Sequence, residues 1–299
     1  MTNIVLYAAT VLIWGSSWLA IKYQLGVVAP EVSLFYRFTI AAAVMLAICA
    51  LRRRPMRFTP GDHAMMAVQG LFLFSANYLL IYLGTQYLTS GLVAVAFSTV
   101  VVMNIFGGAL LLKVPIRPRM VLGAVLGLGG VSLVFWPELE TFDPARGGGL
   151  GLLLVLAGTL SASLGMLTSA GNQKRRLPVI ETNAFGMAYG ALFLWLFTLI
   201  GGSEYNFDPS FIYVGSLVFL AVPASVIAFW TYLTLLGRIG ADRAGYATVL
   251  FPIIALGLST LFEGFAWTTP AIGGVVLVLL GNVLALSGSA VIKGASPGT

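Results

Sequence analysis

Ten long apolar stretches run through this chain, and they restrict the folds open to it more than any other feature. Each approaches the ~20 residues that an α-helix needs to cross the ~30 Å hydrocarbon core of a bilayer. Short connections with turn residues, such as Ala29-Pro30 and Asp208-Pro209, separate most of them. The sequence therefore predicts an all-α polytopic membrane protein with ten transmembrane helices, over Ile4–Lys22, Glu31–Leu51, Ala64–Leu83, Gly91–Leu112, Met120–Trp136, Leu150–Gly171, Glu181–Ile200, Phe211–Leu236, Ala241–Phe262 and Pro270–Ile292.

Charged residues are too few to build a water-exposed surface. They make up 9% of the 299 residues, whereas soluble domains carry about 25%. The mean hydropathy of +0.98 also indicates an integral membrane protein. Because the basic residues are scattered over short loops, no nucleic-acid partner is expected. The single cysteine, Cys49, excludes a disulfide within the chain, and the N-terminal stretch is interpreted as a retained span.

The chain aligns with itself at a constant offset of 150 residues. Matching residues include Gly15 with Gly165, Glu31 with Glu181, Ser75 with Ser225, Tyr82 with Tyr232 and Gly123 with Gly273. We therefore predict a first five-helix repeat over 1–136, a periplasmic linker over 137–149, a second repeat over 150–292 and a short cytoplasmic tail over 293–299. Because five spans are an odd number, the second repeat is expected to be inverted relative to the first. Such repeats are typical of transporters with a substrate site between the halves.

The placement of lysine and arginine predicts the orientation. With the N-terminus in the cytoplasm, thirteen of the sixteen basic residues fall in inner segments. Lys22 and Arg146 remain outside, and Arg37 lies within a span. Cytoplasmic loops carry an excess of such residues, so both termini are expected to be cytoplasmic.

Three stretches of sequence carry a resemblance to a known family. They are Trp14-Gly15-Ser16-Ser17-Trp18, Pro30…Arg37-Phe38, and Leu250-Phe251-Pro252…Glu263…Pro270…Gly273. They resemble the drug/metabolite transporter (DMT) superfamily and, within it, the ten-span EamA-type exporters, over essentially the whole chain. In the first repeat, Val102 and Lys113 stand where members usually have proline and glutamate, so its fourth span is expected to lack the kink.

The resemblance also implies a substrate class and a location. Many members of this type export amino acids or related metabolites across the bacterial inner membrane. The aromatic-rich spans of this chain look like the aromatic amino acid exporter subgroup.

Arg37 is the first candidate for a binding residue. It lies about seven residues inside its span, where an arginine is unfavourable by at least ~2.5 kcal/mol unless it faces a cavity or a partner. One interpretation is a guanidinium that faces the pore and holds a substrate carboxylate or gates the outer mouth. The alternative is a structural arginine that caps carbonyls or pairs with Glu31 or Glu263.

The third span carries a polar and aromatic stripe. Ser75, Tyr78 and Tyr82 share one helical face, and Asn77 lies among them. Polar groups avoid lipid, so this stripe is expected to face a cavity or another helix. A pocket lined in this way suits a neutral or zwitterionic metabolite with an apolar side chain. The alternative, strongest for Tyr82 near the span end, is an interfacial aromatic belt.

Further candidates lie in other spans. The alternative for the serines is hydrogen bonding between helices, and for the aromatics it is space filling or belting. Two mid-span prolines are candidate gating hinges, and their alternative is a static kink. The full set of substrate-binding candidates is Trp14, Ser17, Trp18, Arg37, Asn77, Tyr78, Tyr82, Ser98, Ser163, Trp230 and Tyr246, and the gating candidates are Pro223 and Pro252.

Several classes of chemistry lack their sequence signatures. No aspartate or glutamate lies in the middle of a span, which disfavours a carboxylate proton relay and cationic drugs. The one histidine, His63, lies in a basic loop, and no P-loop, Rossmann or metal-ligand pattern is present. We therefore expect no cofactor, no metal and no enzymatic activity.

The sequence as a whole predicts an inner-membrane exporter that works by alternating access through a central cavity. The expected substrates are aromatic and other neutral amino acids or related metabolites, and a monomer could suffice. The alternative within the superfamily is export of other metabolites or drugs. An integral membrane enzyme is a further alternative, but it would need a cluster of His, Asp or Glu.

Overall fold

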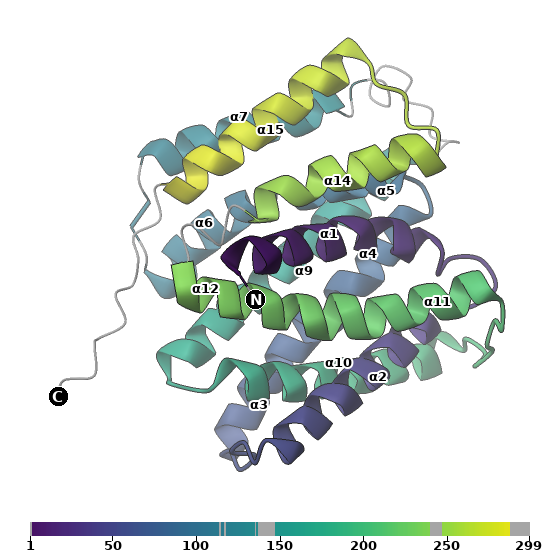
Figure 1. The fold of residues 1–299 in the computed structure, drawn as a ribbon, viewed down its shortest axis with the longest axis vertical. Coiled ribbons are helices and arrows are strands. Elements are labelled where there is room, and N and C mark those ends of the chain that lie inside the picture. The colour runs from purple at the N-terminus through teal and green to yellow at the C-terminus, as the bar shows by residue number, and fades with distance from the viewer. Residues whose placement is uncertain are drawn as a thin grey trace.

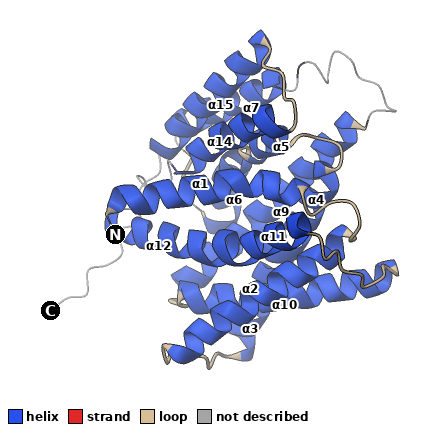
Figure 2. Ribbon diagram, turned by 45° about the vertical axis from the view of Figure 1, so that its right-hand side comes forward, coloured by secondary structure: helices blue, strands red, loops and turns tan. Residues whose placement is uncertain are grey.

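Helices make up the described fold, as the apolar stretches predict. The computed structural model describes residues 2–113, 115–116, 118–134, 136, 147–239 and 247–287. Within these ranges every regular element is a helix, and Figure 2 shows no strand. The elements are α1 (Asn3–Lys22), α2 (Pro30–Leu51), α3 (Pro60–Gln69), η1 (Gly70–Ala76), α4 (Asn77–Thr85), α5 (Ser90–Phe97), α6 (Val100–Leu112), α7 (Pro118–Val134), α9 (Gly148–Lys174), α10 (Val179–Gly201), α11 (Phe211–Phe219), η3 (Leu220–Ile227), α12 (Ala228–Ile239), α14 (Ala247–Phe262) and α15 (Thr269–Ser287).

Seven helical stretches in the described part of the chain are long and apolar enough to cross a membrane. They are Asn3–Lys22, Pro30–Leu51, Pro60–Thr85, Ser90–Leu112, Gly148–Lys174, Val179–Gly201 and Phe211–Tyr232. Three further apolar helices are shorter, at Pro118–Val134, Leu250–Phe262 and Thr269–Leu284. Apolar helices therefore overlap all ten predicted spans, while ten complete crossings remain a prediction.

Local signals explain where helices begin. Thr59 caps α3 by accepting a hydrogen bond from the Asp62 amide, and the Asp62 carboxylate accepts one from the Thr59 amide in return. Pro60 occupies the first helical position, where its missing N–H leaves no bond unmade. Thr89 accepts from the Leu92 amide at the start of α5. These caps place the helix starts within about one turn of the expected positions.

Two π-helical segments interrupt the α-helices at equivalent places in the two halves. They are η1 and η3, whose first residues, Gly70 and Leu220, are 150 residues apart. Pro223 lies inside η3 and lacks the N–H that an α-helix would use there, whereas η1 contains no proline. Such segments are rare and are concentrated at functional sites. The predicted kink at Pro223 is therefore a widened helical turn with a counterpart in the first half.

The closest helix pairs join one half of the chain to the other. In Figure 1, α7 and α15 lie side by side at one edge, α2 packs against α10 on the opposite side, and α1 crosses between α14 and α12. The contacts of α1 with α12 and α14 have counterparts in those of α9 with α4 and α6. The offset of 150 residues relates these contacts, because it maps α4 onto α12 and α6 onto α14.

Glycines allow the tightest of these pairs to approach. A Cβ atom added to Gly130 of α7 would lie 2.5 Å from the carbonyl oxygen of Gly274 on α15. A Cβ added to Gly274 would meet the carbonyl oxygen of Gly130 at the same distance. Small residues at an interface let two helix backbones pack closely where there is no water to drive association.

Several predicted segments lie partly or wholly outside the described residues. Of the predicted linker over 137–149, only 147–149 are described, and Gly147 precedes α9 with a left-handed backbone at φ 68°. The predicted tail over 293–299 lies wholly outside the described range, as does the end of the tenth predicted span.

Candidate functional site

Arg37 lies buried where the two halves of the chain meet. Its side chain, on α2, is 2% exposed. Its Nε and Nη2 atoms donate to Ser225 Oγ on η3, at 3.4 and 3.2 Å. The guanidinium carbon stands 4.4 Å from the centre of the Tyr78 ring. A cation over an aromatic face in this geometry is attracted by the ring.

One nitrogen of this guanidinium remains unpaired. Arg37 Nη1 is buried and has no hydrogen-bond partner among the described residues. The carboxylates considered as its partners are bound elsewhere, since Glu31 accepts from Ser203 and Glu263 accepts from Ser90. The alternative of a structural pair with either glutamate is therefore not what the structure describes.

More unpaired polar atoms lie on the helix that faces Arg37. The hydroxyls of Ser75 and Tyr82 are buried without partners, and Tyr82 is 0% exposed. The shared face predicted for Ser75, Tyr78 and Tyr82 thus presents a stacked ring and two free hydroxyls. Buried polar groups are normally hydrogen-bonded, so several free ones in one region call for a ligand or water.

Asn77 lies on a different side of the same helix. Its Nδ2 donates to the Leu73 carbonyl at 3.1 Å, and its Oδ1 is buried without a partner. Its backbone carbonyl approaches α9, where a Cβ on Gly158 would lie 3.0 Å away. The structure therefore separates Asn77, toward α9, from Tyr78, toward α2.

Aromatic rings extend the site from Arg37 toward α1. Phe38 contacts Tyr78 and Phe74, with ring centres 5.0 and 5.7 Å apart. Phe74 also contacts Phe229. The Phe229 ring packs edge-to-face with Trp14, with ring centres 5.4 Å apart. Such edge and tilted contacts are favoured geometries for aromatic pairs. The rings connect α2, η1, α12 and α1 into one apolar wall.

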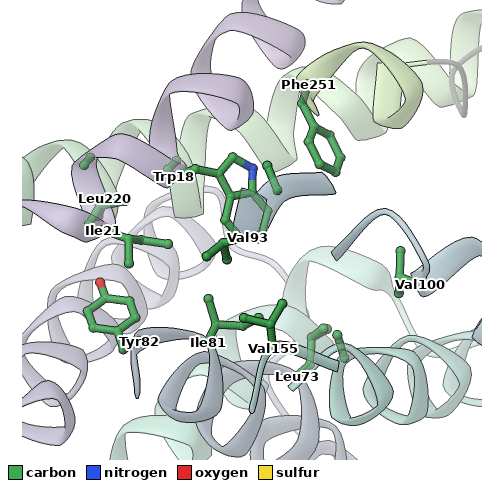
Figure 3. Packing of buried hydrophobic residues seen from close by; sticks show 14 of the residues in the cluster. Trp18, Ile21, Leu73, Ile81, Tyr82, Val93, Val100, Val155, Leu220 and Phe251 are labelled. Carbon is green, nitrogen blue, oxygen red and sulfur yellow. The ribbon is translucent and has the colours of Figure 1, made fainter. Parts of the chain in front are cut away.

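A second aromatic group surrounds Trp18. Its ring centre lies 5.1 Å from Phe97 and 6.0 Å from Phe251. Figure 3 shows Trp18 beside Val93 in the buried cluster that also contains Phe251 and Tyr82. Trp18 is therefore a buried packing residue at the contact of α1, α5 and α14, as well as a candidate for the pocket wall.

The first helix of each half donates a side-chain hydrogen bond to the π-helical segment of the other half. Trp14 Nε1 on α1 donates to the carbonyl oxygen of Ala224, inside η3, at 3.2 Å. Ser161 Oγ on α9 donates to the carbonyl oxygen of Phe72, inside η1, at 2.8 Å. Each widened turn is thus bound by the first helix of the other half, and the Phe72 carbonyl also accepts from the Asn77 amide of its own helix. The indole of Trp14 thus has a structural role at one edge of the site.

The hydroxyls of the candidate serines donate hydrogen bonds within their own helix or to a neighbouring helix. Ser17 Oγ donates to the Trp14 carbonyl at 2.7 Å, and Ser98 Oγ donates to the Val95 carbonyl at 2.6 Å. Ser98 directly follows α5, in the break that separates α5 from α6. Ser163 Oγ joins α9 to α6 by donating to Asn104 Oδ1 at 2.7 Å. These bonds correspond to the alternative interpretation for the serines.

The remaining candidates are not brought to Arg37. Trp230 is 47% exposed, although its neighbour Phe229 points into the aromatic wall. Pro252 is buried inside α14, next to Phe251 of the Trp18 group. Tyr246 lies outside the described residues. The structure brings Arg37 and Tyr78 together, and it adds Ser225 and Phe38, which were not among the substrate-binding candidates.

Two groups of hydrogen bonds join the halves on either side of Arg37. Where α1 ends, Gln24 Nε2 donates to the Tyr213 carbonyl at 2.9 Å and to Ser216 Oγ at 2.6 Å. Where α3 ends, Gln69 Nε2 donates to Asn183 Oδ1 at 2.8 Å, and Asn172 Nδ2 donates to Gln69 Oε1 at 3.0 Å. The unpaired groups around Arg37 thus lie in a region with hydrogen-bonded contacts at either end.

Comparison with known proteins agrees with this arrangement. PagO of Salmonella typhimurium is 23% identical over 286 residues, which cover 94% of this chain and 92% of PagO. An uncharacterized transporter of Archaeoglobus fulgidus is 24% identical, over 94% of this chain and 97% of that protein. The uncharacterized transporter YoaV of Bacillus subtilis is 24% identical, over 90% and 91%.

A solved crystal structure shares the fold, with a TM-score of 0.67 at 18% sequence identity, over 95% of this chain and 96% of that one. The match to the EamA-like transporter family covers residues 1–136 and 149–287, which are nearly the two halves defined by the offset. The chain therefore belongs to the EamA-like transporter family of the DMT superfamily, whose members are multi-pass membrane proteins.

Proposed function

We propose that this transporter exports small metabolites that carry a carboxylate, with aromatic and other neutral amino acids as the preferred class. The observation that supports this most is the buried, partly unpaired guanidinium of Arg37. A buried charge is normally paired, and its position at the contact of α2, α4 and η3 leaves a planar carboxylate as a fitting partner.

The surroundings of Arg37 would divide the substrate into two parts. Nη1 of Arg37 and the Tyr82 hydroxyl would donate to the carboxylate, since the two groups lie close together and neither has a well-formed hydrogen bond among the described residues. The apolar part would lie against the aromatic wall of Phe38, Phe74 and Phe229. Aromatic walls with a few placed polar groups are the usual composition of small-molecule sites.

Transport would proceed by alternating access between two inverted five-helix repeats in the bacterial inner membrane. The exchanged contacts of α1 and α9, and the matched segments η1 and η3, support a two-fold relation between the halves. The excess of basic residues in the predicted inner segments supports cytoplasmic termini. In the proposed cycle, the hydrogen bonds that close the two ends would break alternately, and a single chain would contain the whole site.

Cationic drugs fit this site poorly. The charge beside the aromatic wall is positive, so a second cation would be repelled rather than held. A phosphorylated substrate would need several buried cations. Among the described residues, Arg37 is the single buried arginine, and no lysine is buried. These comparisons favour a single carboxylate as the recognised group.

The proposal is tested by flux from liposomes that contain the purified protein. Vesicles preloaded with labelled phenylalanine or threonine should release it, whereas vesicles preloaded with a cationic drug should not. The Arg37→Lys variant keeps the charge but loses the planar fork. Because a hydrogen bond to a charged group is worth about 1.5–3 kcal/mol, phenylalanine release should fall about tenfold or more.

Arg52→Lys is the matched control, since Arg52 is exposed after the end of α2. Its release rate should equal that of the unmodified protein. Absence of flux for every amino acid tested would exclude the proposed substrate class, and an unchanged rate in Arg37→Lys would exclude carboxylate recognition by Arg37.

A further inference from the structure

Glu181 is a buried carboxylate that the proposed transport site does not use. It lies in the first turn of α10, and its side chain is 0% exposed. Neither carboxylate oxygen has a hydrogen-bond partner among the described residues. An ionised carboxylate without hydrogen bonds is strongly disfavoured in a protein interior.

The helix start explains why this carboxylate is unsatisfied. Glu181 is the third residue of α10, where a glutamate often accepts from the amide of the capping residue. Here the capping residue is Pro178, which has no N–H to donate. By contrast, Asp62 at the third position of α3 bonds the Thr59 amide, and Glu31 in the first turn of α2 accepts from Ser203.

The guanidinium of Arg54 lies near Glu181 and is partly exposed to solvent. Arg54 Nη1 is 3.7 Å from Oε1, too far for a good hydrogen bond, and the Arg54 side chain is 41% exposed. The thiol of Cys49, buried on α2, is within electrostatic range of both groups. Two other charged groups pair with each other, since Arg175, which follows α9, donates from Nη2 to Asp62 Oδ1 on α3 at 2.7 Å.

His63, the titratable ring on α3, also has a partner at this end of the bundle. Its Nδ1 lies 3.0 Å from the Tyr189 hydroxyl on α10. Of the carboxylates described on α2, α3 and α10, Glu181 is therefore the fully buried one without a hydrogen bond.

We propose that Glu181 is a proton-binding site that controls the cytoplasmic mouth of the transporter, an inference that rests on the proposed function and orientation. A proton suits this carboxyl because it needs no cavity, whereas a metal ion or an ammonium group would need space and several ligands. A proton from cytoplasmic water adds to a carboxylate oxygen, and the Arg54 guanidinium, no longer facing a negative charge, moves into solvent. When the proton returns to the same water, the ion pair forms again.

The location of the pair connects the proton to transport. Arg54 follows α2 and Glu181 begins α10, so the pair joins the closely packed helices of the two halves. The hydrogen-bonded contacts of Gln69 with Asn183 and Asn172 lie at the same end. Protonation would release one contact of the closed mouth and favour substrate loading from this side.

A first test detects the proton without any substrate. Infrared difference spectra of the purified protein, recorded between acidic and alkaline pH, should contain a protonated-carboxyl band that is lost in Glu181→Gln. Glu31→Gln is the matched control, because Glu31 is the residue that the 150-residue offset pairs with Glu181 and its carboxylate is already hydrogen-bonded. The band should remain in that control. A Glu181→Gln spectrum identical to that of the unmodified protein would overturn the proposal.

A second test measures the effect on transport, with labelled phenylalanine as the probe. Exchange across liposomes should be faster at acidic than at alkaline pH on the Arg54 side by about fivefold or more, the range of coupling between two sites. In Glu181→Gln, which is permanently neutral, exchange should become independent of pH. Retained pH dependence in this variant, or none in the unmodified protein, would overturn the proposal. Absence of all exchange would instead count against the proposed substrate class, and the infrared result would then decide on Glu181 alone.

Discussion

At the scale of single residues, Ser225 determines how Arg37 is held. The same hydroxyl accepts from Nε and Nη2 of Arg37 and donates to the Leu220 carbonyl at 2.9 Å. It therefore fixes the guanidinium plane while leaving Nη1 free. A guanidinium held from one side by a neutral group keeps its full charge for a ligand.

Removal of this hydroxyl should destabilise the protein. In Ser225→Ala, two buried N–H groups of Arg37 lose their acceptor, so the free energy of unfolding should fall by about 1.5–3 kcal/mol. Thermal unfolding in detergent measures the loss. Ser132→Ala is the control, because the Ser132 hydroxyl is exposed and donates to the Leu128 carbonyl of its own helix. Equal stability of the two variants would show that Ser225 does not anchor Arg37.

Some residues of this candidate site could be proposed from the sequence, and others could not. Arg37 was identifiable because a charge inside an apolar span is rare, and Tyr78 because helical spacing places it with Ser75 and Tyr82. Ser225 and Phe38 are ordinary residues for a span, and only the fold brings them to Arg37. The burial of Glu181 was equally hidden, since a glutamate at the start of a helix is usually solvated or capped.

At the scale of elements, the packing of α7 against α15 depends on glycines that have no side chain to separate the helices. Gly130 and Gly129 are neighbours on α7 but face different surroundings. A Cβ on Gly130 would lie 2.5 Å from the Gly274 carbonyl oxygen, whereas a Cβ on Gly129 has no neighbour within 4 Å. Substitutions at Gly129 and Gly130 can therefore distinguish the effect of helix packing from that of helix propensity.

Alanine at these two positions should have opposite effects. Gly130→Ala should lower the free energy of unfolding by about 1–3 kcal/mol, because the backbones must move apart. Gly129→Ala should be neutral or stabilising by up to about 1 kcal/mol, because alanine favours a helix more than glycine. Thermal unfolding of both variants under identical conditions is the measurement. Similar losses in both would contradict the close contact of α7 and α15.

Most helix positions, but not their interruptions, could be predicted from apolar length. The second span was predicted over Glu31–Leu51 and the structure has α2 over Pro30–Leu51. The π-helical segment η3 could be suspected from Pro223, yet η1 contains no proline and has no comparable signal. The contacts of η1, such as the hydrogen bond from Ser161 to the Phe72 carbonyl, come from a helix distant in the sequence. They therefore cannot be predicted from the residues of η1 itself.

At the scale of the whole molecule, the two halves exchange contacts while their site residues differ. The offset of 150 pairs Ser75, whose hydroxyl is free, with Ser225, whose hydroxyl holds Arg37. It also pairs Arg37 with Met187, so the charge belongs to one half only. A symmetric scaffold with one asymmetric charge is consistent with a single substrate orientation in the proposed cycle.

The most direct test of the account asks which part of a substrate Arg37 recognises. Liposomes with the purified protein exchange labelled phenylalanine in the presence of excess 3-phenylpropionate, which has only the carboxylate, or phenethylamine, which has only the amine. We predict that 3-phenylpropionate inhibits exchange and phenethylamine does not, and that Arg37→Lys abolishes this difference. Inhibition by phenethylamine alone, or by both compounds equally, would contradict carboxylate recognition at Arg37.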